Sequence, residues 1–163
     1  MKTELLLAQV RDQLNLVLSF FSRVDAKASV VLAVDTGMAG YLASRLPSPA
    51  AVLPWLLLIP FLAFALIGFS LWHLYKGAFP NLTGGNLSLV YFREIAKRTE
   101  TKFIDEFTAQ SEADCVKDVL GQVWRNSEIL VEKFNHLKRA FIFMALAVVP
   151  WAFSLGLFSM KLS

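Results

Sequence analysis

Two long stretches without a charged residue constrain the fold of this chain more than any other feature. One runs from Ala50 to Trp72 and the other from Ala140 to Met160. An α-helix needs about 20 apolar residues to cross the roughly 30 Å of hydrocarbon in a bilayer. Pro54, Pro60 and Pro150 lie inside these stretches, and proline is better tolerated in a membrane helix than in a soluble one. We therefore expect both stretches to span a membrane.

A third, shorter candidate runs from Ala28 to Ser44. It is rich in small residues and interrupted by Asp35, and it is flanked by Lys27 and Arg45, whose side chains can reach the bilayer surface. We expect three spans; the alternative is two spans, with this segment a soluble helix. An ionisable residue inside a span is a functional candidate. Asp35 either lines a water path between subunits or forms a hydrogen bond with Thr36 or a neighbouring helix.

Composition and motifs narrow the class of protein. Apolar residues make up 56% of the chain and charged residues 18%, against about 45–50% and about 25% in soluble domains. Nucleophile-elbow, phosphate-loop and zinc-protease motifs are all missing from the sequence, so we expect a protein that is not an enzyme. The net charge of +3 is too small to indicate a nucleic acid polymer as partner. Cys115 is the only cysteine, and His73 and His136 are isolated in the sequence, so no cofactor is expected.

Positive charge predicts the topology. Met1–Lys27 contains four Lys or Arg residues and His73–Arg139 contains ten, whereas Arg45 and Lys161 are the only ones in the hairpin and the tail. Lys and Arg near the ends of spans favour the cytoplasmic side. We expect the amino terminus and the central region on the cytoplasmic side and the carboxyl terminus on the outside. Met1–Lys27 lacks the compact apolar core of a signal peptide, so we expect it to be retained.

Apolar residues at helical spacing predict that the remaining segments are helices. A helix is expected over Leu87–Ala109 after a turn-rich loop at Gly77–Asn86, and a second begins near Ser111 and continues into the last span. The amino-terminal pattern likewise continues past Lys27. The expected fold is an all-α membrane protein, with a three-span bundle continuous with a cytoplasmic helical bundle. Its segments are an amphipathic helix at 1–27, spans at 28–46, 50–75 and 140–160, and a cytoplasmic sensor region at 76–139.

Polar residues at the edge of the first span form one candidate binding group. Arg23, Asp25, Lys27 and Ser29 lie close together in the sequence. One interpretation is a solvated helix end that stops the span. The other is a polar cluster facing the bundle, in which Lys27 meets an anionic ligand and Asp25 orients that ligand or a sugar hydroxyl.

Two further groups lie in the central region. Gln122, Asn126 and Lys133 share one helical face, which is either an exposed polar stripe or a surface that binds a base edge and a phosphate. Tyr91 and Phe92 precede a cation; they either belong to the helix core or stack on a nucleobase.

Several of these stretches occur together in one known family. RVDAKASVVLAVDTG, LSLVYFREIA after the Pro80 loop, and the helix with Gln122, Asn126 and Lys133 make the chain resemble the transmembrane effectors of Pycsar antiphage systems over nearly its whole length. The resemblance implies a bacterial inner-membrane protein that binds cCMP or cUMP, a cyclic pyrimidine mononucleotide made by a partner cyclase during infection. Binding would then impair the membrane in which the protein sits.

The resemblance also implies site residues. The family's polar and aromatic pattern falls on Asp25, Lys27, Ser29, Tyr91, Phe92, Gln122 and Lys133. The family is generally apolar where Asp35 lies, so a pore role of Asp35 would be particular to this chain. Three spans are too few to enclose a wide pore, so a homo-oligomer in the lipid bilayer is expected.

Two alternatives to this function are open. One is a structural or assembly subunit of a larger membrane complex, whose cytoplasmic helices bind a protein and need no small ligand. The other is a membrane-embedded enzyme using Asp35 or Asp25, for which the sequence places no second catalytic group beside either residue.

Overall fold

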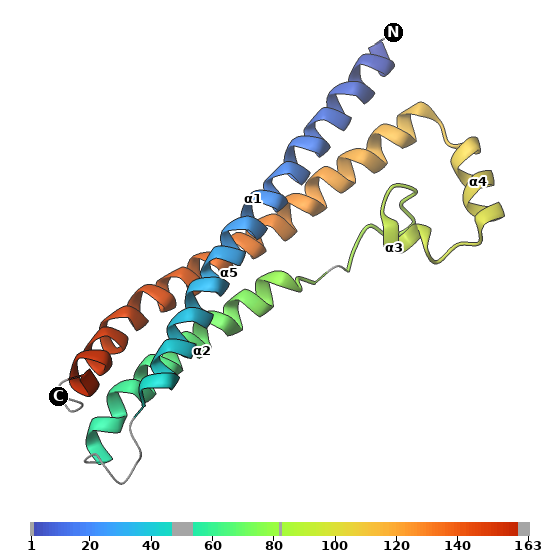
Figure 1. The fold of residues 1–163 in the computed structure, drawn as a ribbon. Helices are drawn as coiled ribbons and strands as arrows, with labels where there is room; N and C mark the ends of the chain where they lie inside the picture. Colours follow the sequence, from blue (N-terminus) through green and yellow to red (C-terminus); the bar gives the residue numbers. More distant parts are fainter. Residues whose placement is uncertain (1, 47–53, 82, 160–163) are drawn as a thin grey trace. The chain divides into compact units, whose positions relative to one another are not determined.

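All regular secondary structure is helical in the part of the protein that the computed structural model describes, which is residues 2–46, 54–81 and 83–159. No strand occurs in these residues, so the all-α prediction is confirmed. Figure 1 shows the arrangement along the chain. The elements are α1 (Lys2–Arg45), η2 (Pro54–Leu57), α2 (Leu58–Ala78), α3 (Phe92–Ile95), α4 (Glu100–Ala109) and α5 (Glu112–Ser159).

The chain divides into two compact units. Unit 1 consists of Met1–Arg23 and Pro80–Glu132, and unit 2 of Val24–Phe79 and Lys133–Ser163. Both α1 and α5 contribute to both units, and the expected continuation of these helices into the apolar segments is confirmed. Each unit has its own core and is described by itself.

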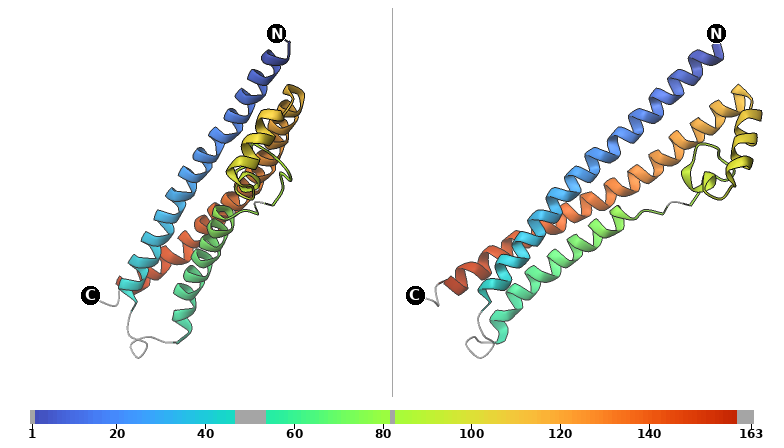
Figure 2. Two further views of the ribbon diagram at one scale, coloured as in Figure 1. Left: turned by 90° about the vertical axis from the view of Figure 1, so that its right-hand side faces the viewer. Right: turned by 45° about the vertical axis from the view of Figure 1, so that its right-hand side comes forward.

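Unit 2 is built from α2 and the apolar parts of α1 and α5, which lie side by side (Figures 1 and 2). Met38 of α1, Ile67 of α2 and Ala147 of α5 form one buried cluster. A second cluster joins Leu42, Ala63 and Phe158 from the same three helices. Alanine at the contact points lets helix backbones approach closely, which is how membrane helices commonly pack.

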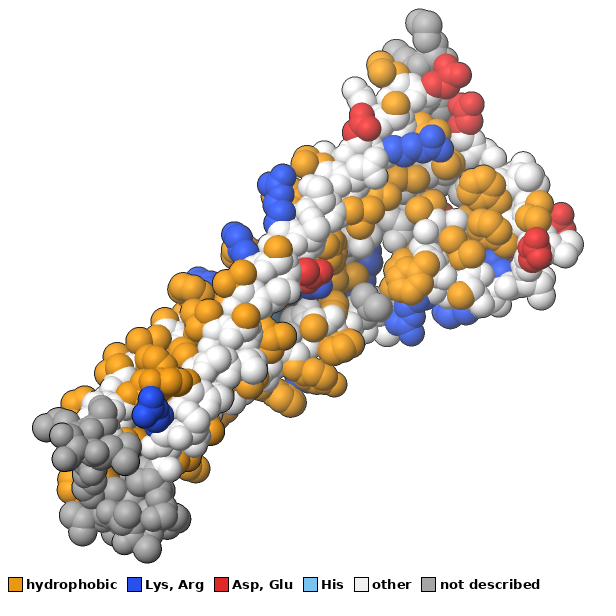
Figure 3. All heavy atoms as spheres, in the orientation of Figure 1, with side chains coloured by type: hydrophobic (Ala, Val, Ile, Leu, Met, Phe, Trp, Pro, Cys, Tyr) orange, Lys and Arg blue, Asp and Glu red, His pale blue; other side chains and the backbone are white. Residues whose placement is uncertain are grey.

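Two helices in the described residues are long and apolar enough to cross a membrane. They are Trp55–Ala78, with 24 residues, and Glu112–Phe158, with 47. Only 22% and 17% of their most apolar windows are buried, whereas a core helix of a soluble protein would be mostly buried. Figure 3 shows the outward apolar side chains covering much of the visible face of unit 2. A surface of this kind fits contact with lipid.

The expected third span is not found among these candidates. Two helices qualify, not three, and the segment at 28–46 is the last part of α1 and not a separate helix. The physical reason lies in its composition, because Asp35, Thr36 and two glycines lower its hydropathy. Leu42 of this segment is nevertheless fully buried between its neighbours in unit 2.

Unit 1 has a smaller core. Val10 of α1 packs against Val116 and Val119 of α5, with Val90 from the intervening loop and Cys115 at the edge of the cluster. All of these are aliphatic or weakly polar side chains, so this core is held by hydrophobic burial.

The single helix expected over Leu87–Ala109 is wrong. The structure has two short helices, α3 and α4, and the Thr99 backbone between them is extended (φ −75°, ψ 156°). The Thr99 hydroxyl accepts a hydrogen bond from the Lys102 backbone N–H at 3.4 Å and begins α4. Threonine at such an N-cap competes with helix continuation, because its side chain replaces a backbone acceptor.

Candidate functional site

An ion pair between α1 and α5 is the centre of the polar surface of unit 2. Lys133 Nζ lies 2.6 Å from Asp25 Oδ1. The Lys133 side chain is only 10% exposed, whereas the Asp25 side chain is 54% exposed. A nearly buried ammonium group needs an anionic partner, because burial of an unpaired charge is costly. The exposed carboxylate supplies that partner and can leave for solvent.

This ion pair lies in the wall of an open groove of about 520 Å³. On one side the groove has the polar groups of Asp25, Ser29 and Lys133, and on the other it has apolar side chains of α2 and the ring of Tyr75. The Ser29 hydroxyl donates to the Asp25 carbonyl oxygen at 3.0 Å. The groove thus combines a cation, a hydroxyl and an aromatic ring, which is a set suited to a small anionic ligand with a ring.

The predicted polar cluster at the edge of the first span is only partly assembled by this groove. Asp25 and Ser29 line it together with Lys133, which the sequence placed in another group. Lys27 is exposed and does not line the groove. Arg23, in unit 1, lies with its guanidinium 5.0 Å from the centre of the Phe20 ring. The contact between Asp25 and Lys133 could not be read from the sequence, because it depends on the packing of two helices.

In unit 1, Tyr91 and Gln122 come together around Ser88. The Ser88 hydroxyl oxygen accepts from Gln122 Nε2 at 3.1 Å and from the Tyr91 backbone N–H at 2.9 Å. Both Tyr91 and Gln122 are buried. Gly85 has a positive φ of 69°, and a Cβ atom there would lie 2.8 Å from the Tyr91 ring. The loop before α3 is therefore closely fitted to these two side chains.

The other two residues predicted in this region have different surroundings. Asn126 donates its amide to the Gln122 carbonyl oxygen of its own helix at 2.8 Å. Phe92 is 61% exposed, and its ring meets that of Tyr91 edge to face at 5.1 Å. Phe92 thus has an open face for stacking, whereas the buried Tyr91 fits the helix-core interpretation.

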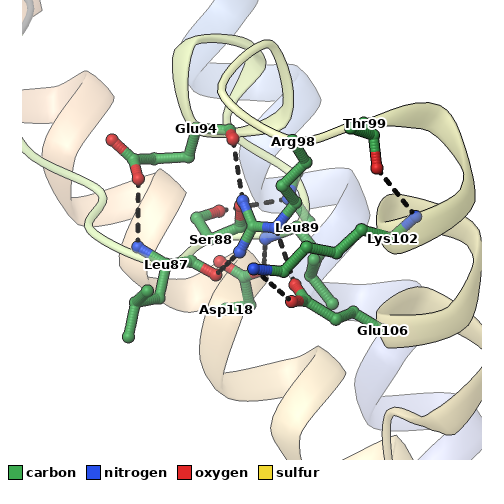
Figure 4. A network of polar contacts seen from close by, with 10 residues as sticks. Leu87, Ser88, Leu89, Glu94, Arg98, Thr99, Lys102, Glu106 and Asp118 are labelled. Carbon is green, nitrogen blue, oxygen red and sulfur yellow. Dashed lines mark hydrogen bonds and ion pairs between the residues drawn. The ribbon is translucent and has the colours of Figure 1, made fainter.

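Arg98 holds the loop of unit 1 through a network that sequence reasoning missed (Figure 4). Its guanidinium donates to the carbonyl oxygens of Leu87 (2.8 Å), Ser88 (3.2 Å) and Glu94 (2.8 Å), and its Nε donates to Glu106 at 2.6 Å. No side-chain spacing in the sequence signals this network, because three of its four contacts are with backbone carbonyl oxygens and the fourth is with Glu106, eight residues later. This network positions the loop that carries Ser88.

Glu94, in α3, contacts the same loop, and its carboxyl group has a shifted pKa. Its carboxylate accepts from Lys97 and from the Leu87 backbone N–H, the latter at 3.3 Å. The hydrogen bond from Lys97 is the main cause that lowers the pKa of Glu94 below its ordinary value, with the positive charge of Lys97 and Arg98 acting in the same direction.

The two histidines are isolated in the sequence but paired in unit 2. His73 Nδ1 lies 3.1 Å from His136 Nδ1, and the His73 ring also stacks on Phe143. Their positions in the sequence could have indicated this pairing. His73 is near the end of α2 and His136 precedes the last apolar stretch, so antiparallel packing of the two helices places both residues at the same height in the bundle. No cluster of three or more metal-binding side chains occurs in the described part of the chain.

Asp35 is fully buried in unit 2, with an exposed fraction of 0%. Its Oδ2 lies 2.6 Å from the Ser70 hydroxyl, which also lies 2.9 Å from the Ala140 carbonyl oxygen. The Thr36 hydroxyl instead donates to Leu32 of its own helix. Of the two sequence interpretations, the structure shows the contact with neighbouring helices.

The apolar helices and the polar groove define a helical membrane protein with a site of small-molecule size. The chain belongs to the Pycsar effector family: the model of the Pycsar effector protein domain matches residues 9–159. The resemblance seen in the sequence is thereby confirmed, and the protein belongs among membrane effectors of antiphage defence that respond to a cyclic nucleotide from a cyclase partner. No curated protein and no solved structure matched the chain in the other two comparisons.

Proposed function

We propose that this effector binds a cyclic pyrimidine mononucleotide, cCMP or cUMP, in the groove of unit 2, and that binding leads it to impair the inner membrane. It acts without catalysing a reaction. The observation that carries the proposal is Lys133, a nearly buried cation that forms an ion pair with the exposed carboxylate of Asp25. Membership of the Pycsar effector family supports the choice of ligand class.

The groove chemistry fits such a ligand. A cyclic mononucleotide carries one negative charge on its phosphate, so one lysine is enough to neutralise it. A charge-assisted hydrogen bond contributes roughly 1.5–3 kcal/mol. The Ser29 hydroxyl and the half-exposed Tyr75 ring line the same groove, where they can meet a sugar hydroxyl and the face of a base. Lys27, Tyr91, Phe92, Gln122 and Asn126 stay predicted ligand contacts.

In this proposal the segment at 28–46 is a third span. Support comes from its packing in unit 2 and from the exposed apolar side chains of Val30, Leu32 and Tyr41, which continue the apolar exterior of the unit. With three spans, the charge distribution puts the amino terminus and residues 76–139 in the cytoplasm and the carboxyl terminus in the periplasm. The groove then faces the cytoplasmic end of the bundle, where the messenger is made.

The active form is proposed to be a homo-oligomer. Three spans are too few to enclose a wide pore, and in the described residues the helices of unit 2 pack directly against one another through side chains such as Met38, Ile67 and Phe158. Impairment of the membrane therefore needs several chains. Ligand acts by stabilising one packing of the helices over another.

Binding to the full chain in detergent tests the proposal. We expect calorimetry to detect cCMP or cUMP but no comparable binding of cAMP. Lys133→Ala should weaken binding roughly ten- to hundredfold, the equivalent of one charge-assisted hydrogen bond. Lys138→Ala, which removes an exposed lysine from the same helix, is the matched control and should leave the Kd unchanged. Equal affinity in the wild type and Lys133→Ala would rule out the groove as the site.

Asp25→Asn provides a second test, in which we expect the opposite effect on nucleotide affinity. The carboxylate neutralises Lys133 in the free protein, so the ligand phosphate must compete with it. We expect Asp25→Asn to bind the nucleotide more tightly than the wild type. Weaker binding would mean that the carboxylate holds the ligand directly.

A further inference from the structure

A polar junction joins the three helices of unit 2, with Asp35 inside its apolar segment, Ser70 near the end of the stretch Ala50–Trp72 and Ala140 at the start of the last apolar stretch. It consists of the Asp35 carboxyl group of α1, the Ser70 hydroxyl of α2 and the Ala140 carbonyl oxygen of α5. All three residues are 0% exposed. The other carboxyl oxygen, Asp35 Oδ1, has no hydrogen-bond partner. A buried polar atom without a partner calls for a physical explanation.

The hydrogen atoms at this junction can be counted. Ser70 has one hydroxyl hydrogen, yet its oxygen lies within hydrogen-bond distance of two oxygens, at 2.6 Å and 2.9 Å. The Ala140 carbonyl oxygen can only accept. Both contacts are hydrogen bonds if Ser70 donates to Ala140 and Asp35 Oδ2–H donates to Ser70. The shorter distance is in the range of O–H···O hydrogen bonds.

The surroundings offer no charge that would compensate an ionised carboxylate. On α1, the nearest other charged residues are Lys27 and Arg45, about two turns or more away in the helix. On α2, the titratable neighbour is His73, which is paired with His136 of α5. Arg139 precedes Ala140 on α5 and is exposed. Asp35 forms no ion pair with any of these in the described residues.

We propose that Asp35 is a proton-binding site that locks the packed form of unit 2. The proposal rests on the proposed membrane placement of this unit. With its proton, Asp35 is a neutral donor that completes the junction. When the helices separate and water reaches the carboxyl group, the proton passes to water as hydronium. The carboxylate that is left cannot return to the apolar contact, because burial of an unpaired charge is costly.

Proton binding and helix packing are therefore linked. Low pH favours the packed form and high pH favours the separated form, because only the neutral acid fits the junction. In the effector, this link sets how easily ligand binding loosens the bundle.

Infrared spectroscopy of the full chain in lipid vesicles tests the proton directly and needs neither nucleotide nor leakage. At neutral pH we expect the C=O stretching band of a protonated carboxyl group in the wild type. Asp35→Asn should lose the band, because it removes the carboxyl group. Its amide N–H can still donate to Ser70, so the junction is kept. Asp105→Asn, a control at an exposed aspartate of α4, should keep the band. A wild-type spectrum without this band would overturn the proposal.

Two further measurements keep the test decisive if Asp35→Asn fails to insert. Labelling aspartate with carbon-13 should shift the band, which assigns it to an aspartic acid. Ser70→Ala should shift it as well, because the acid loses its acceptor; an unchanged position would overturn the assigned junction. Nucleotide-triggered dye release should rise with pH in the wild type and lose that dependence in Asp35→Asn. No release, with the band intact, would contradict the membrane function and still support the proton site.

Discussion

At the scale of single residues, the structure separates side chains that line the groove of unit 2 from side chains that pack within unit 1. Lys133 and Asp25 line an open groove, whereas Gln122 and Tyr91 are buried beside Ser88 and shape a loop. The residue types of these four positions do not tell from the sequence which of them line a groove and which are buried. A glutamine on a helix face donates to a ligand or to its own protein with the same atoms, and only the position of the loop decides which.

Gly85 shows how closely that loop is fitted. Gly85→Ala should destabilise unit 1 by about 1–2 kcal/mol, because the residue has a left-handed backbone and the new methyl group would meet the Tyr91 ring. Hydrogen exchange of the 84–91 amides, compared with the wild type, measures the effect. Gly121→Ala is the control: nothing lies within 4 Å of its added Cβ, and it should be neutral or slightly stabilising. Equal protection in all three proteins would contradict the role given to Gly85.

At the scale of elements, the long helices were predictable and the short ones were not. The apolar stripes of α1 and α5 continue without a breaker across the polar-to-apolar boundary, so the sequence predicts each as one helix. The segment from Leu87 to Ala109 has the same periodicity but breaks between α3 and α4. Thr99 favours that break by capping α4 through the Lys102 backbone N–H, and Arg98 by donating to the distant carbonyl oxygens of Leu87 and Ser88, which periodicity does not report.

Acid should loosen the loop that contains α3. The pKa of Glu94 is lowered by the hydrogen bond from Lys97, so its contribution to stability is complete above the ordinary glutamate pKa of about 4.3. That contribution is lost as the pH falls through the lowered folded-state pKa. We expect the protection factor of the Leu87 amide, which donates to Glu94, to fall over this range more than the protection factors of neighbouring amides.

Glu94→Gln should remove this acid-dependent step and reduce protection at neutral pH. Glu132→Gln, a change at an exposed glutamate of α5, is the matched control and should keep the step. A Glu94→Gln protein with the wild-type pH profile would show that another group causes it.

At the scale of the whole molecule, membrane character was predictable and the groove was not. Length and hydropathy identify Trp55–Ala78 and the last part of α5 from the sequence alone. The groove joins Asp25 to Lys133, more than a hundred positions later in the chain, and this contact depends on which faces of α1 and α5 meet. Likewise, Ser70 is a single serine in an apolar run, and only packing places it against Asp35.

The number of spans determines the side on which the amino terminus lies. In a Cys115→Ser background, Gln13→Cys should be protected from a membrane-impermeant thiol reagent in intact cells, because three spans place residue 13 in the cytoplasm. Ser48→Cys should be labelled, and the wild-type Cys115 should be protected. Labelling of both residue 13 and residue 48 would support two spans instead.

The pairing of Lys133 with Asp25 has a consequence for the resting cell. If Lys133 holds the ligand phosphate as proposed, the carboxylate of Asp25 beside it is an internal competitor, and anions at low concentration would seldom displace it. The apparent affinity for an incoming ligand is reduced by the fraction of time for which the cation is already neutralised. Under the proposed function, such a threshold would keep the effector inactive until its nucleotide signal is abundant.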